Sequence, residues 1–187
     1  LSLGVATVVA AGNNGDDARV SNPGCISSAV TVGATDDRDA VEMGLWFHDA
    51  VYVPGDACNE QRSAALFLAM SAGASPVFRR RVVRLVLTTR RAAAPRTNDQ
   101  KFIDDIDLAG FGASWDEFAR HGDLLREEFA AQSDAEYYAG QARFFGLLQR
   151  RAHLFATGHY RDRLEAGAQA NLARTLAMLR EKGYGER

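Results

Sequence analysis

A histidine and an aspartate stand side by side at the end of an apolar run, Leu45-Trp46-Phe47-His48-Asp49. A neutral imidazole and a carboxylate oxygen both bind divalent cations, so His48 and Asp49 are candidate metal ligands. Adjacent residues on a helix point about 100° apart, so one ion reaches both only above the edge between them. The alternative is a histidine at a helix end beside a solvated aspartate.

A second candidate ligand is Asp107, which shares a predicted helical face with Ile103 and Ile106. Its carboxylate is therefore expected to point towards the core. A buried carboxylate is costly unless a cation or hydrogen bonds hold it, so Asp107 is either a metal ligand or a hydrogen-bonded structural acid. The neighbouring Asp104 and Asp105 are expected to be solvated or to act as caps.

Glu60 opens a predicted helix in the segment Asn59-Glu60-Gln61-Arg62-Ser63-Ala64. A glutamate near a helix N-terminus is favoured by the helix dipole, which is one explanation for its position. The functional alternative is a carboxylate that orients metal-bound water or a group of the substrate.

Taken in order, these segments resemble the HD superfamily of metal-dependent phosphohydrolases, and most closely a bacterial group of predicted HD phosphohydrolases. The resemblance covers about residues 39–187 and rests on an ordered set of segments. Its main members are Leu45-Trp46-Phe47-His48-Asp49-Ala50-Val51-Tyr52, Asn59-Glu60-Gln61-Arg62-Ser63-Ala64 and Ile106-Asp107-Leu108-Ala109-Gly110-Phe111-Gly112.

The resemblance implies a helical bundle around one divalent ion, with His48, Asp49 and Asp107 as metal ligands. It also implies catalytic roles for Asp49 and Glu60 in hydrolysing a small phosphorylated substrate, with nucleotides among the candidates. The sequence does not distinguish Mn, Mg, Ni, Fe and Zn. The alternative is a non-catalytic helical domain, because no histidine precedes His48 and the family's early histidine ligand has no counterpart. Arg90-Arg91 either holds a substrate phosphate or forms a solvated pair.

The segment 1–38 is different in character and resembles a fragment of the subtilisin-like serine proteases. The similarity lies in Gly4-Val5-Ala6-Thr7-Val8-Val9-Ala10-Ala11-Gly12-Asn13-Asn14-Gly15 and in the run 29–35. In that family the residue matching Asn13 stabilises an oxyanion, but the aspartate, histidine and serine motifs of the triad are missing here. We therefore expect no catalytic role for Asn13. The sequence combines a fragment similar to one family with most of another, and three origins stay open: an engineered chimera, a gene-model artefact or a natural fusion. A third alternative for the function is a fragment derived from such a protease.

The expected fold is mainly α: an HD-type helical bundle over 39–187, lacking its usual N-terminal histidine helix, after a short N-terminal strand-turn-strand. Two β-branched runs, at 5–10 and 29–34, predict the strands. Helices are expected over about 59–72, from Pro76 behind a Ser75 cap, and over about 159–182 before Gly183. Two capping boxes begin at Ser114 and Ser133.

Composition narrows the class of protein and its partners. The net charge of −2 and the absence of a basic excess argue against nucleic acid, and no apolar run approaches the length of a membrane span. Only two cysteines are present, which favours a reducing, cytoplasmic location. Oligomerisation is expected through the open edges of the N-terminal strands.

Overall fold

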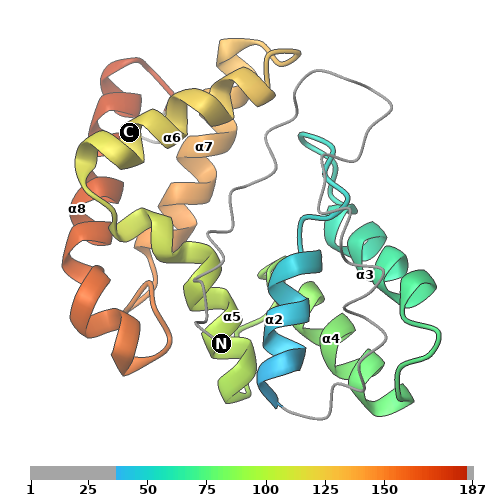
Figure 1. The fold of residues 1–187 in the computed structure, drawn as a ribbon. Coiled ribbons are helices and arrows are strands. Elements are labelled where there is room, and N and C mark those ends of the chain that lie inside the picture. Colours follow the sequence, from blue (N-terminus) through green and yellow to red (C-terminus); the bar gives the residue numbers. More distant parts are fainter. Residues whose placement is uncertain (1–36, 185–187) are drawn as a thin grey trace. The chain divides into compact units, whose positions relative to one another are not determined.

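The computed structural model describes residues 37–184, and every regular element within that range is helical (Figure 1). The mainly α fold is therefore confirmed for this part of the chain. The two predicted strands and Asn13 lie outside the described residues. The helices are α2 (Asp37–Phe47), α3 (Asn59–Met70), α4 (Pro76–Thr88), α5 (Asn98–Leu108), the 3-10 helix η1 (Ala109–Gly112), α6 (Trp115–Glu128), α7 (Asp134–Gln149) and α8 (Gly158–Glu181).

The chain divides into two compact units, Leu1–Arg90 and Arg91–Arg187, called unit 1 and unit 2 below. Helices α2, α3 and α4 belong to unit 1, and α5 to α8 with η1 belong to unit 2. The predicted change of character near residue 38 stays a prediction. None of the described helices combines the length and the apolar character that crossing a membrane requires.

Unit 1 is built around three phenylalanine rings, one from each helix. The Phe67 ring packs edge-on against Phe47 at 5.1 Å and against Phe78 at 6.3 Å between centroids. All three rings are buried, so α2 and α3 both rest on α4. Edge-to-face pairs of this kind add about 0.5–1.5 kcal/mol each to the free energy gained by burial.

Helix α4 begins as its sequence predicts, because the Ser75 hydroxyl accepts a hydrogen bond from the Phe78 N–H and Pro76 takes the first helical position. The apolar spacing of the sequence predicts a buried stripe on this helix, made of Val77, Val82, Leu85, Val86 and Thr89. The structure confirms burial of Val82, Leu85, Val86 and Thr89. Val77 was expected to be buried but is 68% exposed, because the larger Phe78 ring turns inward and fills that side of the helix instead.

Unit 2 is centred on α8, which is packed against η1 and α7. Glycine permits the close approach of η1, since a Cβ at Gly112 would lie 2.6 Å from the Leu164 Cβ. The buried Asn171 amide then donates hydrogen bonds to the carbonyls of Phe111 and Ala113, at 2.8 and 2.9 Å. The core below consists of Leu108, Leu148, Leu154, Phe155, Ala168 and Leu172.

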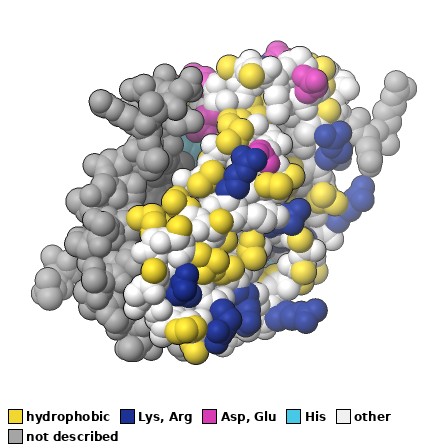
Figure 2. All heavy atoms as spheres, turned by 90° about the vertical axis from the view of Figure 1, so that its right-hand side faces the viewer, with side chains coloured by type: hydrophobic (Ala, Val, Ile, Leu, Met, Phe, Trp, Pro, Cys, Tyr) yellow, Lys and Arg dark blue, Asp and Glu magenta, His cyan; other side chains and the backbone are white. Residues whose placement is uncertain are grey.

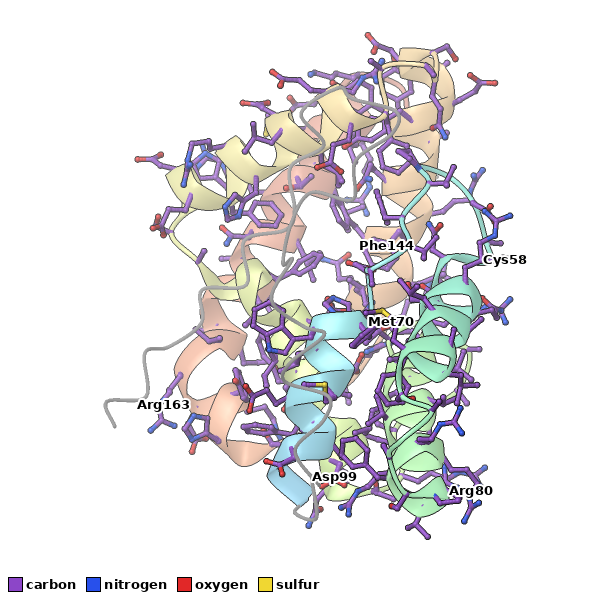
Figure 3. The ribbon with its side chains drawn as sticks, turned by 45° about the vertical axis from the view of Figure 1, so that its right-hand side comes forward. Cys58, Met70, Arg80, Asp99, Phe144 and Arg163 are labelled. Carbon is purple, nitrogen blue, oxygen red and sulfur yellow. The ribbon has the colours of Figure 1, made fainter. Side chains whose placement is uncertain are left out.

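Both predicted capping boxes are present, at Ser114 with Glu117 and at Ser133 with Glu136, and they begin α6 and α7. Burial along these helices is shallower than expected. Apolar spacing predicts burial of Phe118, Leu125 and Phe129 along α6 and of Tyr137, Phe144 and Leu148 along α7. Tyr137 and Leu148 are buried, but α6 has no buried residue and Phe144 (labelled in Figure 3) is 38% exposed. The apolar residues of α6 are therefore only partly covered within the chain.

Candidate functional site

His48 follows the last residue of α2 and is held in one orientation by the helix itself. Its backbone N–H still donates to the Gly44 carbonyl at 2.9 Å. Its side chain is largely buried, and the ring Nδ1 lies 2.7 Å from the Leu45 carbonyl oxygen. A carbonyl oxygen can only accept a hydrogen bond, so Nδ1 is the donor and carries a proton. The ring is thus fixed in the way that a metal-binding histidine is usually fixed, through its other nitrogen.

The second ring nitrogen of His48 faces its neighbour. Nε2 lies 3.3 Å from Asp49 Oδ2, and the Asp49 side chain is 56% exposed. With Nδ1 protonated, the lone pair of a neutral ring points from Nε2, so two electron-rich atoms lie side by side. A proton or a metal cation stabilises such a pair, and adjacent oxygen and nitrogen ligands of a six-coordinate ion are about 3 Å apart. The chemistry of these two donors fits one edge of a divalent cation site.

The loop after Asp49 is fixed by two neutral side chains of α3. The Asn59 amide accepts from the Val53 N–H at 2.8 Å and donates to the Val53 carbonyl at 2.9 Å. One turn later, Ser63 Oγ accepts from the Val51 N–H at 3.0 Å and donates to its carbonyl at 3.2 Å. Asn59 and Ser63, called the loop clamp below, each bind the N–H and the carbonyl of one loop residue, as a neighbouring strand would. They position the backbone next to His48 and Asp49.

Sequence reasoning treated Asn59 only as a neighbour of Glu60 and gave Ser63 no role. Both residues are buried on the same face of α3 as Ala64 and Phe67. Polar residues at that spacing on a buried face need hydrogen-bond partners, which was the available signal. Glu60 itself lies in the first turn of α3 and is half-buried. Helix-dipole placement and a role in orienting a substrate group both fit that position.

In unit 2, Asp107 of α5 pairs with an arginine. Its Oδ2 forms a short ion pair with Arg91 Nη2, and its side chain is 21% exposed. Arg91 adopts a left-handed backbone conformation with φ of 56°, which costs an L-residue free energy and needs compensation from its surroundings. Asp107 was expected to point towards the core, but its side chain is only partly buried. The expectation that Arg91 is one of a solvated pair is wrong, since only 17% of its side chain is exposed.

Asp104 was expected to be solvated, yet it is among the most buried side chains of the chain. Its Oδ1 lies 3.0 Å from Arg91 Nε, and its Oδ2 lies 3.6 Å from Arg151 Nη1. Burial raises the pKa of the Asp104 carboxyl, and the nearby charges of Arg91 and Arg151 offset only part of that increase. The sequence pattern placed Asp104 on an exposed face of α5, because the two arginines that make its burial tolerable lie outside that helix.

Asp105 was also expected to be solvated or to act as a cap. It is completely buried, and it caps helix α8, which lies far from it in the sequence. Its carboxylate accepts hydrogen bonds from the N–H of Ala156 at 2.6 Å and of Thr157 at 2.8 Å, and from the Thr157 hydroxyl. Thr157 is the N-cap of α8, and its own side chain makes no cap bond. Asp105 therefore neutralises the positive end of the longest helix.

Glu165 performs a similar task from within α8. Its two oxygens accept from the N–H groups of Leu154 at 2.8 Å and Phe155 at 3.1 Å, and Gln169 donates to Oε1 at 2.8 Å. Burial pushes the pKa of Glu165 upwards, but these three hydrogen bonds outweigh it and lower the pKa. Together, Asp105 and Glu165 fix the segment 154–157 that leads into α8.

The structure thus brings His48 and Asp49 together in unit 1, while Asp107 lies in unit 2 paired with Arg91. Among residues 37–184, no three His, Cys, Asp or Glu side chains form a group that could hold a metal ion. The full set of three predicted ligands stays a prediction.

Comparison with known proteins finds no family model, no curated protein and no solved structure that matches this chain. The resemblance to HD phosphohydrolases consequently depends on the ordered sequence segments alone. What the structure contributes is the local geometry of the candidate residues.

Proposed function

We propose that the chain is an HD-type, divalent-metal-dependent phosphohydrolase domain that hydrolyses a phosphate ester. The observation that carries the proposal is the His48–Asp49 pair, with Nδ1 protonated towards Leu45 and Nε2 directed to Asp49. When bound, the ion would supply a Lewis acid for a phosphoryl oxygen. His48 and Asp49 are the residues of unit 1 that would hold it.

The chain's own residues would prepare this site before any ligand arrives. Leu45 fixes the imidazole, and the loop clamp fixes the backbone that follows Asp49. Preorganisation of this kind lowers the cost of binding, because little freedom is lost when the ligand arrives. Glu60, one residue after Asn59, is the carboxylate proposed to orient the attacking water.

The third ligand in the proposal is Asp107. Its carboxylate already has a cationic partner in Arg91, so coordination of an ion by Asp107 requires Arg91 to release or share it. This pairing favours a second candidate, in which the domain keeps the helical fold without catalysis. In that case the guanidinium of Arg91 permanently supplies the positive charge that the carboxylate needs.

A phosphatase assay distinguishes the two candidates. The full chain would be incubated with p-nitrophenyl phosphate and a set of nucleoside monophosphates, with Mn²⁺, Mg²⁺ or Ni²⁺ or with EDTA. We expect turnover that requires metal and falls on the order of 100-fold in His48→Gln and Asp49→Asn. His121→Gln and Asp162→Asn, at exposed positions of α6 and α8, are the matched controls and should keep wild-type rates.

Absence of turnover with every metal and substrate would favour the non-catalytic candidate. Equal rates of hydrolysis in wild type and His48→Gln would show that His48 has no role in the site. A Glu60→Gln variant that binds metal normally but hydrolyses slowly would support the proposed orienting role, because only the reaction step would be affected.

A further inference from the structure

One stretch of the chain has a marked excess of positive charge. Between Glu60 and Asp99 there are eight arginines and no acidic residue, although the whole chain has a net charge of −2. Some of these arginines have local partners, such as Arg62, which pairs with Asp56 at 2.7 Å, and Arg79, which donates to the Leu68 carbonyl. The rest of the chain is correspondingly acidic.

Helix α4 displays two of these arginines on its outer face. Val77, Arg80, Arg84 and Leu87 follow one another at helical spacing, and all four are exposed, Val77 to 68% and Leu87 to 39%. Arg80 extends outward from α4 in Figure 3, and Figure 2 shows basic side chains among hydrophobic ones on one face of the molecule. Within the part of the chain that the structure describes, neither Arg80 nor Arg84 forms an ion pair.

Helix α6 offers the complementary pattern. It contains five acidic residues and two arginines, and none of its fourteen residues is buried. Asp123 and Glu127 are exposed, and beside them Leu124 is 48% exposed. As with the arginines, no ion pair of these two acids occurs among residues 37–184.

We propose that α6 of a second copy of this chain docks on the outer face of α4. Arg80 and Arg84 are four residues apart, as are Asp123 and Glu127, so both pairs are spaced about 6 Å along their helices. Leu124 would meet one apolar end of the α4 face, either Val77 or Leu87, because these two residues lie about 15 Å apart along the helix. A symmetric dimer of this kind contains two such contacts, one in each direction.

An anionic membrane surface is the main competing occupant. Helices that lie in a membrane interface separate a basic polar face from an apolar one. On α4 the arginines stand between Val77 and Leu87 on one stripe, which suits a partner helix that also alternates charge and apolar surface. The matching acids are present in this same chain. The dimer does not depend on the proposed hydrolase activity.

Charge reversal with a mixing step tests the dimer. The mass of the full chain would be measured by analytical ultracentrifugation over a range of concentrations and salt. We expect a monomer–dimer equilibrium weakened by salt, with Kd raised at least about tenfold in R80E/R84E and in D123R/E127R. An equimolar mixture of the two variants should regain dimerisation, because each of its two contacts again joins opposite charges.

The matched controls are Arg180→Glu and Asp162→Arg, which reverse exposed charges on α8 and should leave Kd unchanged. Circular dichroism would establish that each variant keeps its helical content. A wild type that stays monomeric, a variant that still dimerises, or a mixture that stays monomeric would each overturn the proposal. So would binding to phosphatidylserine vesicles that R80E/R84E loses and D123R/E127R keeps, since α4 would then face lipid.

Discussion

The two units hold their irregular segments by different chemistry. In unit 1, the neutral amide of Asn59 and the hydroxyl of Ser63 each bind both backbone groups of one loop residue. In unit 2, two carboxylates, Asp105 and Glu165, each accept backbone N–H groups of the segment 154–157. A charged acceptor makes the stronger bond but leaves a larger penalty when its partners are lost, so unit 2 should be the more sensitive to mutation.

The largest effect is expected from Asp105→Ala. Three hydrogen bonds to a buried carboxylate disappear, and two backbone N–H groups at the start of α8 lose their acceptor. Urea unfolding should show a loss of about 3–5 kcal/mol in the free energy of unfolding. Asp162→Ala, at an exposed position of α8, is the control and should change it by less than about 0.5 kcal/mol. A loss below about 1 kcal/mol in Asp105→Ala would contradict the capping role.

The next effect is expected from Arg91→Met, which removes the main cationic partner of buried Asp104. Breaking a buried ion pair costs about 3–5 kcal/mol, and we expect about 3 kcal/mol because Arg151 remains near the carboxylate. The neighbouring Arg90 is exposed, so Arg90→Met provides a control at the next position. Equal unfolding free energies for the two variants would show that the Arg91–Asp104 pair stabilises nothing.

Asn59→Ala in unit 1 should cost less, about 1–3 kcal/mol, because two hydrogen bonds between uncharged groups are lost. Asn59→Asp distinguishes the contributions of the two hydrogen bonds. A carboxylate still accepts from the Val53 N–H but no longer donates to the Val53 carbonyl. Thermal unfolding should place Asn59→Asp between wild type and Asn59→Ala. A cost larger than that of Asp105→Ala would reverse the comparison between the units.

The smallest expected effect is a difference in how two acids of unit 2 change the free energy of unfolding with pH. The pKa of Asp104 is raised from 3.8, so its contribution to stability is present below 3.8 and is lost as the pH rises through the higher value. The pKa of Glu165 is lowered from 4.5, so its contribution is present above 4.5 and is lost as the pH falls.

Unfolding free energies measured from below pH 3.8 to neutral pH would reveal these slopes. The advantage of wild type over Asp104→Asn should shrink as the pH rises, while its advantage over Glu165→Gln should grow. Parallel pH dependences for the two variants would contradict the opposite environments assigned to these carboxyls.

Local signals were sufficient to predict much of the helical pattern. Helix α3 begins at Asn59, α4 begins behind Ser75, and Gly183 ends the last helix with a positive φ, as their sequences indicate. Each of these features depends on residues within a few positions of one another, such as a hydroxyl and an N–H three residues later. The capping boxes of α6 and α7 were predictable for the same reason.

The buried acids of α5 were not predictable from the same signals. Asp104 and Asp105 appear as outward-facing charges in any hydrophobic pattern, and what allows their burial lies 13 to 52 positions away, at Arg91 and Thr157. Side-chain size also altered the pattern, since Phe78 replaces Val77 in the core. For the candidate metal site, the adjacent His48 and Asp49 were visible in the sequence, but the orientation of the imidazole depends on the Leu45 carbonyl and was found only in the structure.

The proposal that His48 and Asp49 hold a divalent ion is tested most directly by Mn²⁺ binding, measured by electron paramagnetic resonance on metal-free full-length chain. We predict one bound Mn²⁺ per chain, lost in His48→Gln and retained in Asp162→Asn. Wild type and His48→Gln that bind Mn²⁺ equally, or a wild type that binds none, would contradict the proposed metal site.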